Sequence, residues 1–282
     1  MFWTLIKIIN KLGLLRYINT SYTLNVANKK IIVPVMGNLS LLSISEPWMT
    51  KVLMSLKPSF GGTFIDVGVN LGQTLIKAYS VLDQLNYVGF EPNPGCVYYV
   101  RELIKLNRFQ NCNILPVAVS NEASILSLHF FYDDESDSTA SMLDLFRPDQ
   151  NIDHSINIPV FNLHYFKPFL PDASNSILKI DVEGAELEVL QGLEDWIVAN
   201  KPIIIIEILP IYNVANIYRL QRQQQLEHLL NKWDYTSHRI DKLNITIEKV
   251  ETIGVHSNLE YCDYILCPRS KSDQISLHFI AQ

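Results

Sequence analysis

A short segment, FIDVGVNLGQT at residues 64–74, combines an acid with two glycines at the end of an apolar run. Asp66 stands just ahead of Gly68, and Gly72 stands where a helix is expected to begin. Glycine lets the backbone approach a ligand closely and take positive φ, and the first N–H groups of a helix point at whatever lies there. An acid beside such a loop suits a ligand that carries positive charge, such as an amino group. The segment therefore predicts a small-ligand site beyond the carboxyl end of a strand.

The spacing of the glycines argues against the two commonest nucleotide-binding loops. A dinucleotide fingerprint, G-x-G-x-x-G counted from Gly68, requires glycines where Asn70 and Gln73 stand. A Walker A loop requires Gly-Lys-Ser/Thr, which the segment lacks. The remaining pattern, D-x-G-x-N-x-G, has no room for a pyrophosphate. The alternative interpretation is an ordinary strand-to-helix turn capped by Asn70.

A second acid, Glu91, supports the ligand interpretation. It follows the apolar run YVGF and stands 19 residues after Gly72 (91 − 72), which is the place of an acid that accepts hydrogen bonds from ribose hydroxyls. A carboxylate can accept both hydroxyls of a vicinal diol at once. Pro92 and Pro94 then end the strand and begin the next helix. Together, the loop and Glu91 indicate an adenosine-type ligand with a compact charged group.

Further acids end two later apolar runs. Asp181 and Glu183 follow Ile177–Ile180, and Glu207 ends the run IIIIE. An acid at the ligand edge of a sheet is costly unless it is paired or used, although Glu183 could instead favour the dipole of the first turn of the next helix and Glu207 could be a salt-bridged strand end. We interpret Asp181, with Glu183 or Glu207, as an acidic centre that could act as a general base. A divalent cation held by Asp181 and Glu207 is the alternative, for which two carboxylates are weak evidence.

Alternating apolar runs and helical segments would position these residues. The expected strands are 63–67, 87–90, 113–119, 124–132, 177–180, 203–208, 235–240, 246–250 and 261–267. The expected helices are 46–56, 71–82, 94–106, 185–199 and 219–232. Continuous apolar strands that alternate with helices predict an α/β fold, with a parallel sheet covered on both faces. The polar stretch 133–157 is expected to be a long loop that covers the site.

Residues 1–45 precede this alternation and are expected to form an extension. Met1–Leu15 has apolar residues near helical spacing, is interrupted by lysines and is too short for a membrane span. It predicts a helix that docks on the domain, or alternatively a peripheral contact with a membrane surface. Residues 22–36 predict a β-hairpin. The main α/β domain is then expected over 46–270, with a C-terminal tail at 271–282.

The composition limits which kinds of binding partner and which cellular location are expected for the protein. The chain has 282 residues, 48% of them hydrophobic, and a formal net charge of −6. Because no long Lys/Arg run occurs, nucleic-acid binding is disfavoured. The four cysteines form no C-x-x-C pair and are too few for a disulfide framework, which favours a cytoplasmic location. The seven histidines, the usual rivals for a general base, stand in no recognisable spacing.

Three motifs in order resemble the FkbM family of methyltransferases: DVGVNLG at 66–72, FEPNP at 90–94 and LKIDVEGAELEVLQG at 178–192. The resemblance covers about 46–267, including the EP pair at the start of the first expected helix. One departure is Val69, where the family loop usually has Ala. The resemblance implies the class I methyltransferase fold, which is Rossmann-like and has a seven-stranded, mostly parallel sheet with one antiparallel strand. It also implies S-adenosylmethionine as the methyl donor and an O-methyl product, often on a sugar hydroxyl of a glycan or natural product.

The resemblance also assigns residues to the donor. Those that would contact its methionine part are Asp66, Gly68, Asn70 and Gly72. Glu91 would hold the ribose. Ala118 and Val119, at the end of the third strand, would lie near the adenine, or would alternatively be plain core. A sugar hydroxyl is a poor nucleophile unless its proton leaves during attack, so the acceptor side would use Asp181 with Glu183 or Glu207.

Two other functions are compatible with parts of the sequence. A module that binds S-adenosylmethionine without chemistry would keep the glycine loop, but Asp181 and Glu183 argue against it. A nucleotide-dependent oxidoreductase is disfavoured by the missing glycines. Small-molecule and glycan acceptors both fit the expected chemistry, and the sequence carries no motif for one acceptor or one oligomeric state.

Overall fold

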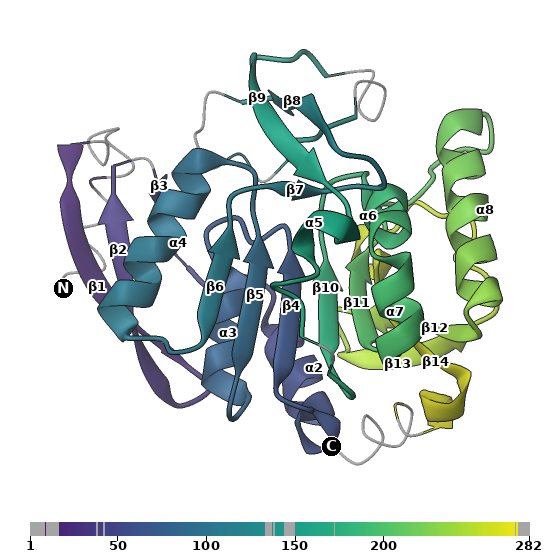
Figure 1. Ribbon diagram of the computed structural model, residues 1–282, viewed down its shortest axis with the longest axis horizontal. Coiled ribbons are helices and arrows are strands. Elements are labelled where there is room, and N and C mark those ends of the chain that lie inside the picture. The colour runs from purple at the N-terminus through teal and green to yellow at the C-terminus, as the bar shows by residue number, and fades with distance from the viewer. Residues whose placement is uncertain are drawn as a thin grey trace.

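An eight-stranded mixed sheet forms the centre of the computed structural model (Figure 1). In spatial order its strands are β13 (Thr246–Val250), β12 (Tyr235–Asp241), β14 (Asp263–Pro268), β11 (Ile203–Glu207), β10 (Ile177–Ile180), β4 (Thr63–Val67), β5 (Asn86–Phe90) and β6 (Cys112–Leu115). β14 runs antiparallel to both of its neighbours, so β12 has the direction of the parallel strands again. These features confirm the predicted class I methyltransferase fold, and β13 adds an eighth strand at the edge.

The structure describes residues 9, 17–37, 39–41, 43–132, 137, 139–143, 150–171, 173–273 and 275. Of the helix predicted for Met1–Leu15, only Ile9 is described, so the membrane contact expected there lies outside these residues, as does most of the tail at 271–282. Within the described part of the chain, no helix combines the length and the apolar character needed to cross a membrane.

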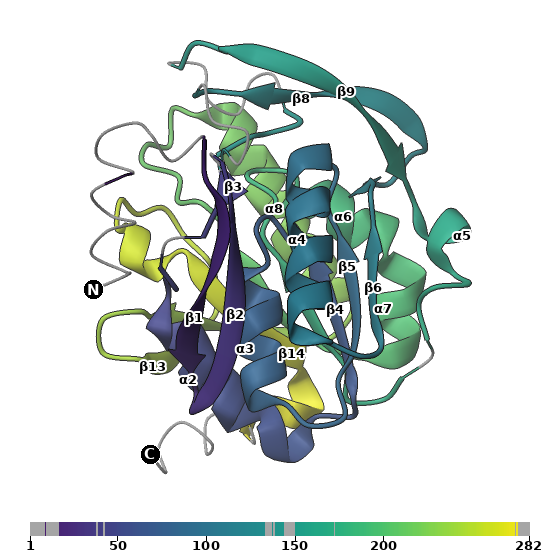
Figure 2. The same ribbon diagram turned by 90° about the vertical axis from the view of Figure 1, so that its left-hand side faces the viewer.

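Helices cover both faces of the sheet, as predicted, and Figure 2 shows the two layers on either side of it. One face carries α2 (Pro47–Leu56), α3 (Gln73–Val81) and α4 (Pro94–Asn107). The other carries α5 (Leu163–Phe166), α6 (Glu186–Gly192), α7 (Glu194–Asn200) and α8 (Ile217–Lys232). Short 3₁₀ helices in the described part of the chain include η2 (Lys57–Ser59), η3 (Leu259–Tyr261) and η4 (Arg269–Lys271).

The central strands are continuous apolar runs in the sequence because alternate side chains are buried on opposite faces of the sheet. Phe64 packs in the core on the α2–α3 face, whereas its neighbour Ile65 packs in the core on the α6–α7 face. All five residues of β4 are buried, including Asp66. Because Asp66 is two residues from Phe64, its side chain points toward the α2–α3 face, and so does that of Lys179, its register partner on β10. The sheet thus carries charge on one face near its carboxyl edge.

The predicted N-terminal hairpin is present and packs on α4. β1 (Asn19–Val26) pairs antiparallel with β2 (Lys29–Met36), and a short β3 (Leu39–Ser40) joins β2. The side chain of Tyr99 on α4 ties this sheet down, because its hydroxyl donates to the carbonyl of Pro34 at 2.9 Å and accepts from the N–H of Leu41 at 3.1 Å.

A separate three-stranded sheet lies over the carboxyl edge of the main sheet (Figure 1). It consists of β7 (Ala118–Val119), β9 (His154–Phe161) and β8 (Ser124–Phe130), in that order. The single strand predicted for 113–119 was therefore wrong: β6 ends at Leu115, and Pro116, which has no N–H for a ladder, separates it from β7. The prediction of a loop through residue 157 was also wrong, because β9 begins at His154 and pairs with β8.

The single helix predicted for 185–199 is two helices, α6 and α7, which meet at Leu193. The N-cap of α6 is Ala185, and its first residue, Glu186, accepts the N–H of Gly184 on its side chain at 2.8 Å. Glu183 therefore precedes the helix, and our placement of Glu183 in its first turn was wrong.

Candidate active site

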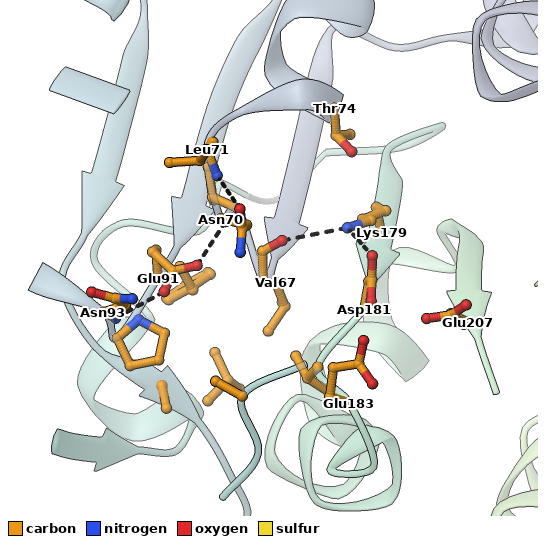
Figure 3. Close-up of a pocket in the computed structure, with 18 of the residues that line it drawn as sticks. Val67, Asn70, Leu71, Thr74, Glu91, Asn93, Lys179, Asp181, Glu183 and Glu207 are labelled. Atoms are coloured by element: carbon orange, nitrogen blue, oxygen red, sulfur yellow. Dashed lines mark hydrogen bonds and ion pairs between the residues drawn. The ribbon is translucent and has the colours of Figure 1, made fainter. Parts of the chain in front are cut away.

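A cavity of about 310 Å³ opens at the carboxyl edge of the sheet. The glycine loop after β4, the turn after β5 and the segment after β10 form its walls, and β7 and the β8–β9 connection lie across it. Glu91 and Asn70 lie on one side of it, and Asp181, Glu183 and Glu207 lie on the other (Figure 3). The structure thus brings the two predicted acidic groups to one cavity.

The glycine loop is shaped by close contact with the next strand. Gly68 has a φ of 91°, and a Cβ atom there would lie 1.9 Å from the carbonyl oxygen of Asp181. Only glycine therefore permits this approach. The N–H groups of Gly68 and Val69 both donate to the carbonyl of Phe90, at 3.0 and 3.3 Å, which fixes the loop to the end of β5.

Asn70 and Gly72 have different places in this loop. Asn70 lines the cavity with a φ of 47°, and its side-chain oxygen accepts the N–H of Leu71 at 2.7 Å. Gly72 has a φ of 78° and packs against α4, where a Cβ atom would lie 3.0 Å from Leu103. Gly72 is not among the residues that line the cavity. Its expected contact with a donor is therefore not supported, and close packing of α3 on α4 explains the glycine.

Glu91 is positioned by the loop itself. One of its carboxylate oxygens accepts the N–H of Asn70 at 2.7 Å, and the other accepts the N–H of Asn93 at 2.8 Å. The residue is 6% exposed and lines the cavity. Burial raises the pKa of Glu91 to about 7, although both N–H groups lower it. The carboxylate can accept further hydrogen bonds from a diol in the cavity.

Asp66 lies beneath the cavity and not on its wall. It is fully buried and accepts a hydrogen bond from the hydroxyl of Tyr87, and the ammonium of Lys179 lies 3.6 Å from it. Burial raises the pKa of Asp66, while Lys179 and Tyr87 lower it. We expected Asp66 to contact the donor, but the structure gives it these protein partners and leaves it out of the cavity lining.

Lys179 is a central residue that sequence reasoning missed. Its ammonium lies 3.0 Å from Asp181 and 3.4 Å from the carbonyl oxygen of Gly68. Burial lowers the pKa of Lys179, but Asp181, Asp66 and Glu46 outweigh burial and raise it above the ordinary value. A lysine within the buried run ILKI was the signal that could have revealed it. Lys179 links the carboxylate beneath the cavity to the one on its wall.

Asp181, Glu183 and Glu207 converge, with one carboxylate oxygen from each lying within 4.8 Å of the others. The carboxyl groups of Asp181 and Glu207 are close enough for the charge of one to affect the pKa of the other. Burial raises the pKa of Glu207 to about 9, and Asp181 adds to this, whereas Lys179 holds the pKa of Asp181 below its ordinary value against the effect of burial. The pair therefore holds one proton at neutral pH, on Glu207. The thiol of Cys262 also donates to Glu207, at 3.1 Å.

The segment after β10 has a strained backbone that turns Glu183 into the cavity (Figure 3). Glu183 has a φ of 51° and Gly184 a φ of 109°. The carbonyl of Glu183 accepts the hydroxyl of Ser141 at 2.8 Å, which connects this turn to the covering segment. Positive φ in a residue other than glycine costs free energy, and such strain gathers at functional sites.

Ala118 and Val119 line the cavity from β7, not from the end of the third strand of the main sheet. They are 4% and 1% exposed, so the cavity meets an apolar wall there. Of the segment expected to cover the site, Asp137, Ala140 and Met142 line the cavity.

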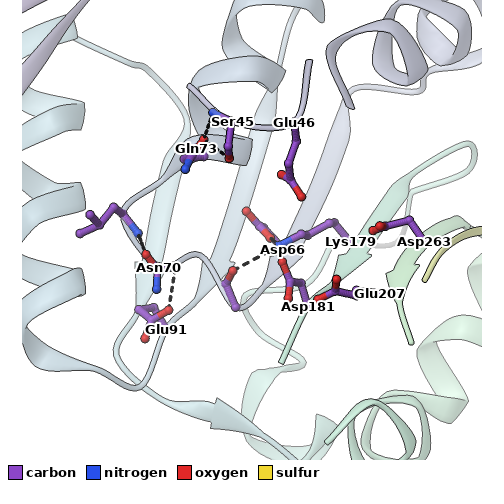
Figure 4. A network of polar contacts seen from close by, with 12 residues as sticks. Ser45, Glu46, Asp66, Asn70, Gln73, Glu91, Lys179, Asp181, Glu207 and Asp263 are labelled. Carbon is purple, nitrogen blue, oxygen red and sulfur yellow. Dashed lines mark hydrogen bonds and ion pairs between the residues drawn. The ribbon is translucent and has the colours of Figure 1, made fainter. Parts of the chain in front are cut away.

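Four further lining residues were not predicted to be part of the site, and they lie where α2 and α3 begin: Ser45, Glu46, Gln73 and Thr74. The carboxylate of Glu46 points from α2 toward the charged face of the sheet (Figure 4).

The sheet order and a cavity at its carboxyl edge define a protein of the class I methyltransferase fold. The family described as "Methyltransferase FkbM domain" matches residues 66–265. The chain therefore belongs to this family.

Individual relatives are distant. "Methyltransferase 1" of Beauveria bassiana (strain ARSEF 2860) is 25% identical over 144 residues, which cover 46% of this chain and 58% of that protein. The chain thus spans less than two thirds of that relative. The solved structure of methyltransferase FkbM from Methylobacillus flagellatus KT is 13% identical, with a TM-score of 0.46 over 74% of this chain and 44% of that one. An O-methyltransferase from Bacillus cereus in complex with SAH is 12% identical, with a TM-score of 0.47 over 81% and 83% of the two chains.

Proposed function

We propose that this protein transfers a methyl group from S-adenosylmethionine to a hydroxyl group of a sugar, a glycan or a natural product. The observation that carries the proposal is one cavity with the buried acid Glu91 at one end and the neighbouring carboxyl groups of Asp181 and Glu207 at the other. Family membership supports the methyl-transfer chemistry.

The residues at the Glu91 end fit an adenosine group. The buried carboxylate of Glu91 would accept the ribose hydroxyls, and the loop N–H of Asn70 holds that carboxylate in place. Ala118 and Val119 offer the apolar surface that an adenine ring needs. The donor supplies a methyl group that is already activated on a sulfonium sulfur, so the protein's main task is positioning.

The acceptor hydroxyl would lie against Asp181. The hydroxyl oxygen forms a bond to the methyl carbon as the carbon–sulfur bond breaks, and the electron pair of that bond stays on sulfur. Asp181 takes the hydroxyl proton, because it is ionised beside Lys179 while Glu207 is protonated. Its low pKa makes Asp181 a weak base, but the proton of a partly methylated hydroxyl is strongly acidic, so a carboxylate suffices.

Asp181→Asn tests this role. We expect turnover to fall by roughly 10²- to 10⁴-fold, the range for loss of a general base. Binding of S-adenosylhomocysteine, measured calorimetrically, should change by less than about threefold, which is below 1 kcal/mol. Asp195→Asn, at an exposed position on α7, is the matched control. Near-normal turnover of Asp181→Asn with an active acceptor would remove the assignment.

A divalent cation is the competing means of activation, because Asp181, Glu183 and Glu207 could share one. A cation would have to replace the proton of Glu207. If Asp181 acts as a base, activity survives chelation, and Glu207→Gln keeps much of it because an amide N–H can still donate to Asp181. If a cation acts, chelation and Glu207→Gln both abolish activity, and added cation restores the chelated enzyme.

The assay for the function itself is transfer of a labelled methyl group to a panel of glycans, lipid-linked sugars and small hydroxylated molecules. Calorimetry with S-adenosylhomocysteine and NAD separates the remaining classes. Binding of the former without transfer to any acceptor favours a binding module. Binding of NAD alone favours an oxidoreductase and contradicts the proposal.

A further inference from the structure

A charged pair, Glu46 and Lys77, lies at an end of the cavity to which the proposed reaction assigns no role. Glu46 immediately precedes α2, and its side chain is 38% exposed and lines the cavity. Lys77 lies on α3 with a completely buried side chain. Its ammonium is 3.1 Å from Oε2 of Glu46. Figure 4 shows Glu46 next to Ser45 and Gln73 and facing the charged edge of the sheet.

The buried lysine fixes the position of Glu46. An unpaired buried ammonium is strongly unfavourable. Among the described residues, Glu46 is the one carboxylate within salt-bridge distance of Lys77. Burial lowers the pKa of Lys77, and Glu46 opposes this effect. Lys77 itself cannot reach a ligand because it is covered, so the pair presents one carboxylate to the cavity, held from behind by an ammonium.

The same end of the cavity also offers donors to an anion. Gln73 and Thr74 are the first two residues of α3, and both line the cavity. The N–H groups of a first helical turn favour negative charge. Thr74 is 4% exposed and lines the cavity, and its hydroxyl has no hydrogen-bond partner in the described part of the chain. Gln73 is oriented by Ser45, whose N–H and hydroxyl both donate to its side-chain oxygen at 2.8 Å.

A carboxylate next to a helix N-terminus and an unpartnered buried hydroxyl complements a zwitterion. We propose that this end of the cavity binds the α-amino acid part of the methyl donor, with the ammonium on Glu46 and the carboxylate at Thr74 and the first turn of α3. The inference rests on the donor of the proposed function. It transfers to Glu46 the role that the sequence suggested for Asp66, which lies beneath the cavity with Lys179 as its partner.

The other acids of the site fit an ammonium less well. Asp181 already contacts Lys179 at 3.0 Å and lies beside the carboxyl group of Glu207. Glu91 accepts two backbone N–H groups at the opposite side of the loop. Within the described residues, Oε1 of Glu46 has no hydrogen-bond partner, so it can accept an ammonium without displacing a protein contact.

Calorimetric binding of three ligands to the full chain tests the proposal. S-Adenosylhomocysteine has the whole amino acid group, its decarboxylated analogue keeps only the amine, and 5′-methylthioadenosine has neither. Glu46→Gln should weaken the first two by about 10- to 100-fold, the value of a charge-assisted hydrogen bond, and change methylthioadenosine by less than about twofold. Thr74→Val should weaken S-adenosylhomocysteine alone. Glu102→Gln, a surface acid paired with Lys105 on α4, is the control.

The ligand comparison separates the possible failures. No binding of S-adenosylhomocysteine by the unmodified chain overturns the proposed function. Normal binding that is insensitive to Glu46→Gln overturns only the role of Glu46, as does equal weakening of all three ligands. If Glu46→Gln does not fold because Lys77 is left unpaired, the double variant Glu46→Gln/Lys77→Met removes both charges. The double variant should bind methylthioadenosine normally and the two amines weakly, and normal binding of the amines overturns the proposal.

Discussion

Glu91 should make donor binding depend on pH near neutrality. Its carboxylate is 6% exposed, and burial raises its pKa to about 7, against an ordinary value of 4.5. Only the ionised form can accept both hydroxyls of a ribose while it accepts the N–H groups of Asn70 and Asn93. Affinity for S-adenosylhomocysteine should therefore fall as pH falls through 7.

The size of the effect follows from the ionised fraction. With a pKa of about 7, roughly 91% of Glu91 is ionised at pH 8 and roughly 9% at pH 6. The dissociation constant should then rise about tenfold between these pH values, which corresponds to about 1.4 kcal/mol. This dissociation constant can be measured by calorimetric titration at constant ionic strength. Four or five pH values from roughly 5.5 to roughly 8.5 bracket the raised pKa of Glu91.

Ionisation of Glu91 should have the opposite effect on the stability of the protein without ligand, which should fall as pH rises. The folded pKa is raised by about 2.5 (7 − 4.5), so the folded state holds the proton more tightly than the unfolded state. The contribution of Glu91 to stability is present below pH 4.5 and is lost as pH rises to about 7, by about 3 kcal/mol. Because Gln resembles the protonated carboxyl, Glu91→Gln and the unmodified chain should have similar stabilities in urea unfolding at low pH, and the unmodified chain should become the less stable of the two as pH rises toward 7.

The variant Glu91→Gln tests whether Glu91 causes the pH dependence of both binding and stability. It should bind S-adenosylhomocysteine weakly at pH 8, and its affinity should change little at lower pH. Glu102→Gln, on the surface of α4, should behave like the unmodified chain. If Glu91→Gln retains the full pH dependence, another group controls binding and our reasoning about Glu91 is refuted.

Three more substitutions test the packing that shapes the cavity. Gly68→Ala places a Cβ atom 1.9 Å from the carbonyl oxygen of Asp181 at a φ of 91°, so urea unfolding should show a loss of about 2–4 kcal/mol, and donor binding should disappear; normal stability would mean that the loop is not tightly packed. Gly89→Ala places a Cβ atom 2.6 Å from Val69 and should cost about 1–3 kcal/mol, part of which Val69→Ala should restore; purely additive losses in the double variant would contradict this contact. Lys179→Met leaves buried carboxylates unpaired and should cost about 3–5 kcal/mol at pH 8 but less at pH 5, where raised carboxyl pKa values allow protonation; an equal loss at both pH values would contradict the ion pair.

Much of the fold could be predicted because local sequence signals and tertiary structure agree in the central strands. The five-residue run Thr63–Val67 is buried along its whole length, and β4 has those bounds. The glycine at 68 also gave the right place for a tight turn, although the reason is contact with the backbone of Asp181, which lies 113 residues later (181 − 68). The split at Pro116 and the pairing of β9 depend on which sheet each strand joins, and periodicity carries no such information.

Val69 illustrates a departure that sequence comparison could notice but not explain. Its side chain is 3% exposed and lines the cavity. It lies over Gly89 on β5, so close that a Cβ atom on that residue would collide with it. The larger residue at position 69 is therefore accommodated by a strand residue without a side chain, and the two positions must be considered together.

The candidate site was predicted best where a single strand end carries the acid, and least well where two elements must meet. Glu91 and Asp181 follow apolar runs, and the sheet brings them to one cavity. Lys179 becomes significant only through its register opposite Asp66, because alternation then turns both side chains toward the α2–α3 face. Glu46 precedes α2 and Lys77 lies on α3, and only the packing of these two helices on that same face joins the pair. Glu46, which precedes the first helix of the domain, thus reaches the edge of the sheet. Because Asp66 is buried there and already paired with Lys179, we assign the binding of the donor's ammonium to Glu46.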